Sequence, residues 1–264
     1  MRQGRRPRRD DDRGTVAVTL LTGAVVTLVV WAVSLVRSVS LRALIYSLPL
    51  PITLVLLATP IRVSAQQLVG VVLLNVFVAV VTLLYHRLRW NIVLADLAGV
   101  AAYICGSLAL VRAGGLPFVP VLAAALAAWV LLVRLARRGT ASPLAAARSR
   151  PSRRGLPTLG KLAVLAVGAL LMVGLGQLLQ GMVVTFPYSG VLVVIETRRD
   201  LVPFRAHFAR NSLALLAFVT AYHLAQDLSR PLAVAAGWAA FLGCALLLHL
   251  TRARADGLRT LSAR

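Results

Sequence analysis

Apolar residues along this chain gather into long runs, and charged residues are concentrated between them. A helix needs about 20 mainly apolar residues to cross the hydrocarbon core of a bilayer, and nine runs come near that length. The pattern therefore predicts an all-α fold, a polytopic transmembrane bundle of about nine spans. The expected segments are Thr15–Val36, Leu41–Thr59, Gln67–Tyr85, Ile92–Val111, Leu116–Leu135, Leu159–Leu179, Met182–Glu196, Phe208–Gln226 and Pro231–Leu250.

We expect two of these segments not to form straight, complete helices. Leu41–Thr59 contains Pro49 and Pro51, and the short segment Met182–Glu196 contains Pro187. Proline removes an amide donor and clashes with the preceding turn, so we expect a kink or a half-helix at both places.

The two broken segments are copies of one another at a constant offset of 138 residues. A one-residue slip then brings Tyr85-His86 onto Tyr222-His223. One long apolar run precedes each broken segment, and one more follows each Tyr-His pair, which predicts two four-helix repeats joined by an extra helix. The matched pairs are Ser47 with Thr185, Pro49 with Pro187, Leu54 with Leu192, Val55 with Val193 and Thr59 with Thr197.

The predicted organisation has six parts. A region rich in arginine, proline and serine separates the linking helix from the second repeat, and this composition favours a solvated connector. The parts are a basic amino-terminal tail at 1–14, repeat 1 at 15–111, the linking helix at 112–136, the basic connector at 137–161, repeat 2 at 162–250 and a basic carboxy-terminal tail at 251–264.

Arginine positions indicate how the repeats are oriented. Five spans between equivalent helices would turn the second copy upside down, and the arginine bias does change sides between copies, as inverted repeats require. The arginines at the amino terminus oppose this scheme and favour eight crossings with parallel repeats, so both topologies stay open. The arginines that set the bias are Arg37, Arg42, Arg87 and Arg89 in the first copy, and Arg198, Arg199, Arg205 and Arg210 in the second.

Composition agrees with a membrane location. Hydrophobic residues make up 59% of the 264 positions and charged residues 14%, whereas a soluble domain has about 25% charged residues. The net charge of +21 lies in tails and loops, where it orients the chain and contacts anionic headgroups. Nucleic acid is not an expected partner, because no basic patch is interleaved with aromatic residues. An arginine-rich composition with much alanine, valine and leucine favours a bacterial cytoplasmic membrane.

Signatures of catalysis and of metal binding are absent from the sequence. It contains no H-E-x-x-H, G-x-S-x-G or Walker motif and no histidine cluster, so we expect neither an enzyme nor a cofactor or metal. Cys105 and Cys244 lie in apolar runs without partners at ligand spacing, and we expect both to be buried as small apolar residues.

The prolines mark the expected substrate site. In repeat transporters, discontinuous helices at matching positions expose backbone groups near the middle of the membrane, and these bind ions or substrates. Nearby hydroxyl groups are expected at the same place, namely those of Ser47, Thr185 and Ser189 and the phenols of Tyr46 and Tyr188. The alternative is a proline kink whose backbone groups are satisfied by a neighbouring serine or threonine.

Few ionisable residues lie in the apolar runs, and each has two interpretations. Asp96 either pairs with Arg89 at the interface or lines a cavity, and Glu196 either pairs with the arginines after it or takes part in proton or substrate binding. His86 and His223 are either titrating groups or parts of Tyr-His anchors at the membrane boundary.

Each repeat resembles the small four-helix bacterial inner-membrane proteins of the GlpM-like kind. The residues that carry this likeness are Leu48-Pro49 and Phe186-Pro187, within Ala43–Thr59 and Gly181–Thr197. The resemblance implies an association with glycerol phosphate metabolism and exopolysaccharide production. The four-helix unit with reversed charge bias is also similar in architecture to the fused drug/metabolite transporters.

The sequence thus leads to two functional hypotheses. The first is a transporter or permease for a small molecule, with its site at the interface between the repeats. The second is a membrane scaffold for envelope or exopolysaccharide assembly that transports nothing. Self-association into a homo-oligomer is compatible with both.

Overall fold

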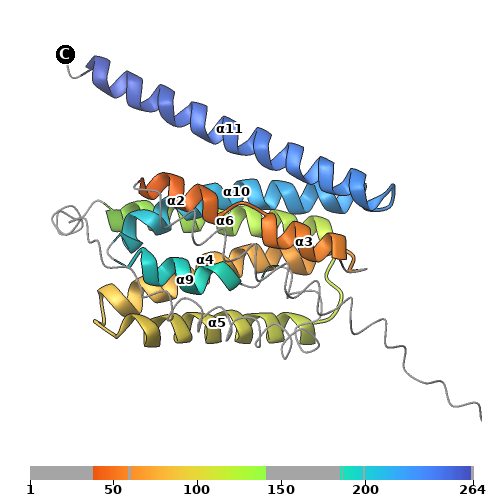
Figure 1. Ribbon diagram of the computed structural model, residues 1–264, viewed down its shortest axis with the longest axis horizontal. Helices are drawn as coiled ribbons and strands as arrows, with labels where there is room; N and C mark the ends of the chain where they lie inside the picture. The colour runs from red at the N-terminus through yellow and green to blue at the C-terminus, as the bar shows by residue number, and fades with distance from the viewer. Residues whose placement is uncertain (1–37, 59–60, 141–184, 186, 199, 263–264) are drawn as a thin grey trace, which may run out of the picture.

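The described part of the chain is entirely helical. A computed structural model describes residues 38–58, 61–140, 185, 187–198 and 200–262 (Figure 1). The spans predicted at Thr15–Val36 and Leu159–Leu179 lie outside these residues. The main helices are α2 Val39–Tyr46, α3 Leu50–Ala58, α4 Ala65–His86, α5 Ile92–Arg112, α6 Phe118–Thr140, α9 Tyr188–Glu196, α10 Leu201–Ala225 and α11 Arg230–Ser262.

Local chemistry explains where the long helices begin. A capping box starts α4: the Ser64 side chain accepts from the first turn, and the Ser64 amide donates to the Gln67 side chain at 2.7 Å, which satisfies amides that have no partner within the helix. The side chain of Asn91 caps α5 by accepting from the Val93 amide at 2.9 Å. The connection to α6 turns at Gly114, whose φ of 81° a residue with a side chain rarely adopts.

The break expected at Pro49 is confirmed. Helix α2 ends at Tyr46, and α3 begins at Leu50. The Pro49 carbonyl accepts from both the amide of Thr53 at 2.8 Å and its hydroxyl at 2.7 Å. The hydroxyl of Ser47 donates to the Leu44 carbonyl at 2.7 Å. Local serine and threonine hydroxyls therefore supplement the backbone hydrogen bonding around the break, as they do at kinks in other membrane helices.

Four of the described helices are long and apolar enough to cross a membrane, which indicates a membrane protein. Helix α10 is not one of the four, because Arg205, Arg210 and Asn211 interrupt the apolar character of its first half. The four helices coincide with the predicted third, fourth, fifth and ninth segments, and they extend over Ala65–His86, Ile92–Arg112, Phe118–Ala136 and Arg230–Thr251.

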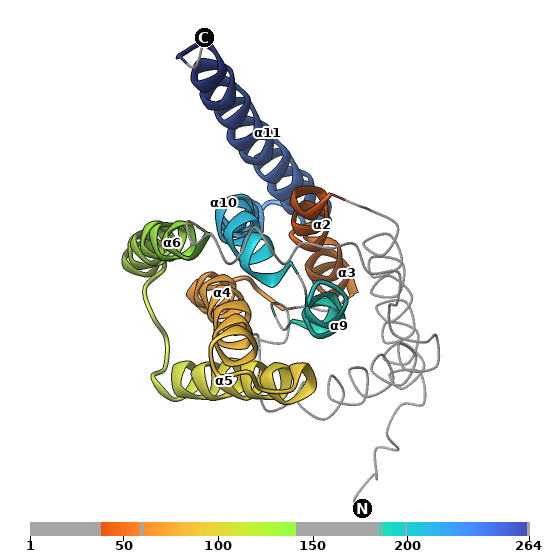
Figure 2. The same ribbon diagram turned by 90° about the vertical axis from the view of Figure 1, so that its left-hand side faces the viewer.

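Helices α4 and α10 form the centre of the bundle. Helix α10 packs against α2, α4, α6 and α11, and Figure 2 shows α4 and α10 surrounded by the other helices. Fully buried side chains on these two helices include Phe77 of α4 and Phe204 and Phe218 of α10. On α6 and α11, by contrast, many large apolar side chains are exposed, such as Val119, Leu131 and Leu247. In a bilayer such side chains are the ones that contact lipid.

The long helices alternate in direction, so the bundle has two ends. At one, which we name the His223 end, the Nδ1 atom of His223 in the last turns of α10 lies 2.7 Å from the carbonyl oxygen of Val63, just before α4. Phe118, the first residue of α6, stacks on the same imidazole ring at 3.7 Å. Helix α10 is therefore antiparallel to α4 and α6. The opposite end, which we name the Arg87 end, holds the end of α4 and the start of α10.

The short helices beside each proline break pack against the long helices that follow the other break. The short helix α9 packs against α4 and α5, whereas α2 packs against α10 and α3 contacts α11. An ion pair of 3.8 Å between Arg42 of α2 and Asp200 places the start of α2 at the Arg87 end. Helices α2 and α3 thus run towards the His223 end and α9 runs away from it.

Candidate functional site

The two proline breaks lie close together inside the bundle. Pro187 and Pro49 are both buried, and Pro187 immediately precedes α9. In the first turn of α9, a Cβ atom added to Gly190 would overlap the Tyr46 hydroxyl and would lie 3.1 Å from the Phe77 ring. Only a glycine therefore allows α9 to approach the end of α2 this closely. The broken segments from the two parts of the chain thus contact each other.

Thr185, two residues before Pro187, is seated on α4 and bonded to α5. Its hydroxyl lies 2.8 Å from the Tyr103 hydroxyl, and both side chains are buried. A Cβ atom added to Gly70 of α4 would overlap the Thr185 hydroxyl and would lie 2.8 Å from its Cβ. The absence of a side chain at Gly70 therefore creates the niche that Thr185 occupies.

Helix α5 presents a buried polar stripe to this place. Asp96, Gly99, Tyr103 and Ser107 are buried along the length of α5, and their spacing of three, four and four residues puts them on one helical face. A Cβ atom at Gly99 would lie 2.8 Å from the Phe77 ring. Glycine at this position therefore allows α5 to lie close to α4, with Asp96 on the buried face of α5.

Asp96 is buried, and the described residues give it no ionic partner. Its side chain is 3% exposed and its Oδ1 atom has no hydrogen-bond partner, while Arg89 is exposed. The interpretation of Asp96 as an interfacial acid paired with Arg89 is therefore wrong, because the described residues show no ion pair between them. Asp96 and Tyr103 lie within electrostatic range of Tyr46, which is 8% exposed and whose hydroxyl also lacks a partner. We name Tyr46, Asp96, Tyr103 and Thr185 the buried polar cluster.

Sequence reasoning singled out only part of this cluster. It identified Tyr46, Thr185 and Asp96, but not Tyr103 or the niche at Gly70. The usable signal was the spacing of Asp96, Gly99 and Tyr103 along one face of an apolar helix. The side chains of Tyr188, Glu196 and Arg199, which the sequence also pointed to, lie outside the described part of the structure.

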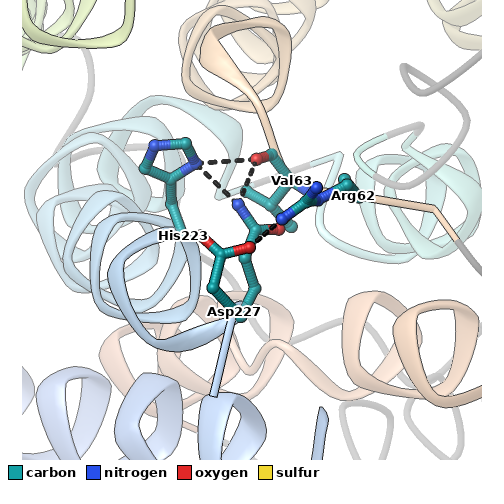
Figure 3. A network of polar contacts seen from close by, with 5 residues as sticks. Arg62, Val63, His223 and Asp227 are labelled. Atoms are coloured by element: carbon teal, nitrogen blue, oxygen red, sulfur yellow. Dashed lines mark hydrogen bonds and ion pairs between the residues drawn. The ribbon is translucent and has the colours of Figure 1, made fainter. Parts of the chain in front are cut away.

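The two Tyr-His pairs have different surroundings. Tyr85 and His86 contact each other edge to face at 5.0 Å near the end of α4. Tyr222 is buried on α10, and His223 belongs to the network at the His223 end that Figure 3 shows. The side chain of Gln226 donates to the Val63 carbonyl at 3.0 Å and accepts from the Val63 amide at 2.9 Å.

Beside this network, Arg62 and Asp227 form an ion pair (Figure 3). Both side chains are 72% exposed, so the pair lies at the surface. Together with His223 and Gln226, it fixes the residues just before α4 to the end of α10. The network shares no residue with the buried polar cluster.

The described arginines of the predicted topology signal lie at the Arg87 end or close to it, whereas Arg37 and Arg199 are outside the described residues. Arg198 and Arg205 are half-buried around the start of α10. Arg210 donates to the Leu248 carbonyl and, at 3.1 Å, to the Thr251 hydroxyl, which ties α10 to α11. Arg210 therefore joins two helices as well as carrying charge.

Neither cysteine is buried as predicted. Cys105 is exposed on α5 and Cys244 is half-buried on α11, and both are free thiols. The expectation of burial fails because these apolar helices have an outward face that would contact lipid. In the described residues, no three histidine, cysteine, aspartate or glutamate side chains lie close enough together to hold a metal ion.

Comparisons of the chain with protein-family models, with curated proteins and with solved structures find no match. The geometry of the chain itself therefore carries the functional argument.

Proposed function

We propose that this protein is a multi-pass transporter or permease for a small molecule in the bacterial cytoplasmic membrane. It is built from two inverted repeats with a binding site between them. The observation that carries the proposal is the meeting of the two proline breaks beside the buried polar cluster. Discontinuous helices of transporters expose free backbone groups at such a meeting point.

The directions of the equivalent helices support inverted repeats. Helices α4 and α10 follow the two broken segments and are antiparallel, as judged from His223 and Val63. The broken segments, α2 with α3 against α9, also run in opposite directions. The exchange of packing partners then has the form expected of a pseudo-two-fold axis in the membrane plane.

The arginine distribution supports an orientation with the Arg87 end in the cytoplasm. Cytoplasmic loops carry an excess of arginine and lysine. Among the described arginines near the helix ends, Arg42, Arg87, Arg89, Arg134, Arg198 and Arg205 lie towards the Arg87 end, and Arg62, Arg112 and Arg230 lie towards the His223 end.

The test is transport by the purified full-length protein in liposomes. Solid-supported-membrane currents and radiolabelled influx are measured over sugars, amino acids, amines and phosphorylated polyols, the last because of the GlpM-like resemblance. At least one solute should enter faster than in empty liposomes.

A matched pair of variants then tests the site. Thr185→Val removes the hydroxyl bonded to Tyr103 and should lower transport at least tenfold. Thr220→Val removes a hydroxyl bonded to the Leu216 carbonyl of its own helix α10 and should leave transport within twofold. Influx that equals empty liposomes for every solute refutes transport and favours the scaffold hypothesis, in which cross-linking recovers an envelope-assembly protein.

A further inference from the structure

The buried polar cluster contains a carboxyl group that has no ion-pair partner among the described residues. The carboxylate of Asp96 is 3% exposed, and its Oδ1 atom accepts no hydrogen bond. The described ion pairs, Arg42 with Asp200 and Arg62 with Asp227, are elsewhere. Buried charges in proteins are normally paired with an opposite charge or bind a cation, so an unpaired carboxylate here points to an absent positive partner.

A second polar group at the same place also lacks a partner. The Tyr46 hydroxyl is buried, has no hydrogen-bond partner and lies within electrostatic range of Asp96 and Tyr103. Its position is fixed, because the Tyr46 ring packs against the rings of Phe204 and Phe208 at 5.8 Å and 4.9 Å. Two buried oxygens that lack hydrogen-bond partners in the described structure and lie within electrostatic range of each other form a site that a ligand could satisfy.

We infer that Asp96, with the hydroxyl oxygen of Tyr46, binds the positive charge of a singly charged cation. One carboxylate neutralises one positive charge, and the Tyr46 hydroxyl oxygen is a neutral ligand. A monovalent metal ion, a proton or an organic ammonium group satisfies this description. The inference rests on the proposed transport function for its purpose, since the cation is then either the cargo or the coupling ion.

Conservative variants separate binding from folding. Asp96→Asn keeps the shape of the side chain and removes its charge, and Tyr46→Phe keeps the ring packing and removes only the hydroxyl. Asp227→Asn is the matched control, because Asp227 is exposed and lies at the other end of the bundle. Size-exclusion chromatography and thermal unfolding in detergent should show that all three variants are folded, with Asp96→Asn at least as stable as the wild type.

The assay uses three probes on the full chain. Binding of radiolabelled sodium and methylammonium is measured on purified protein, and proton uptake is measured in liposomes loaded with a pH-sensitive dye. The wild type should bind or move at least one probe. Asp96→Asn should lower that signal at least tenfold and Tyr46→Phe severalfold, whereas Asp227→Asn stays within twofold. Which probe responds identifies the source of the charge.

Two results overturn the inference: no probe bound or moved by the wild type, or an Asp96→Asn signal equal to the wild type. If the wild type and Asp96→Asn carry a neutral or anionic solute equally well, the inference fails and transport stands. If cation binding depends on Asp96 but no solute crosses the membrane, transport fails and the cation site stands.

Discussion

The niche at Gly70 gives the sharpest test of how the two parts of the chain fit together. In Gly70→Ala, the added methyl group would overlap the Thr185 hydroxyl and would lie 2.8 Å from the Thr185 Cβ. The threonine must therefore move, and its 2.8 Å hydrogen bond to Tyr103 is lost.

The expected cost has two parts. Overpacking of a filled core costs about 1–3 kcal/mol, and the lost hydrogen bond adds about 1 kcal/mol. Replacing a helical glycine by alanine also stabilises the helix by up to about 1 kcal/mol. Gly243→Ala on α11 controls for this gain, because nothing lies within 4 Å of a Cβ atom added there. The free energy of unfolding of Gly70→Ala should therefore lie about 2–4 kcal/mol below that of Gly243→Ala.

The measurement is equilibrium unfolding in mixed micelles, followed by tryptophan fluorescence as the fraction of denaturing detergent rises. Adding Thr185→Ala to Gly70→Ala removes the overlapping hydroxyl and should recover about 1–2 kcal/mol as a coupling energy between neighbouring sites. A Gly70→Ala variant within 0.5 kcal/mol of Gly243→Ala, or a coupling energy near zero, would show that Thr185 does not occupy the niche.

Three further predictions follow from contacts between helices. In a chain without native cysteines, single cysteines replacing Arg87 and Arg198 should react with an impermeant thiol reagent from the same side of the membrane, and a cysteine replacing Asp227 from the other; labelling of the first two from opposite sides contradicts the antiparallel arrangement. Trp238→Phe removes the 3.0 Å hydrogen bond to the Thr53 hydroxyl and should lower the free energy of unfolding by about 1 kcal/mol in the same micelle assay, and an unchanged value contradicts it. Asp227→Asn breaks an ion pair that is 72% exposed and should cost less than about 1 kcal/mol, with the cost disappearing at high salt; a loss that salt does not reduce argues against it.

Hydropathy predicted the positions of α4, α5 and α6 well, but it misjudged where α10 begins. The predicted segments at α4, α5 and α6 match the observed helices to within a few residues, because a long apolar run can only be helical in a bilayer. Helix α10 begins at Leu201 rather than at Phe208. Its first turns contain Pro203, which the first turn of a helix tolerates. They also contain Arg205, which lowers the hydropathy although the side chain is half-buried against protein.

The candidate site, too, could be predicted only in part. The break at Pro49 could be predicted because proline acts on its own helix. The contact between Thr185, Tyr103 and Gly70 joins residues far apart in the sequence, and a single sequence carries no signal for such pairs. Helix α11 illustrates the remaining difference, because it continues to Ser262 through the region expected to be a basic tail. Arginine and alanine favour a helix in that region although they end the apolar run.

The seat of Thr185 on Gly70 also constrains the order of assembly. A nascent chain that has emerged only to residue 140 has made α4 and α5, but the residue that fills their niche is still to be synthesised. The niche can therefore be filled only after Thr185 has been synthesised. A product that ends before Thr185 would keep an empty niche. Only a second chain that contains Thr185 could fill that niche.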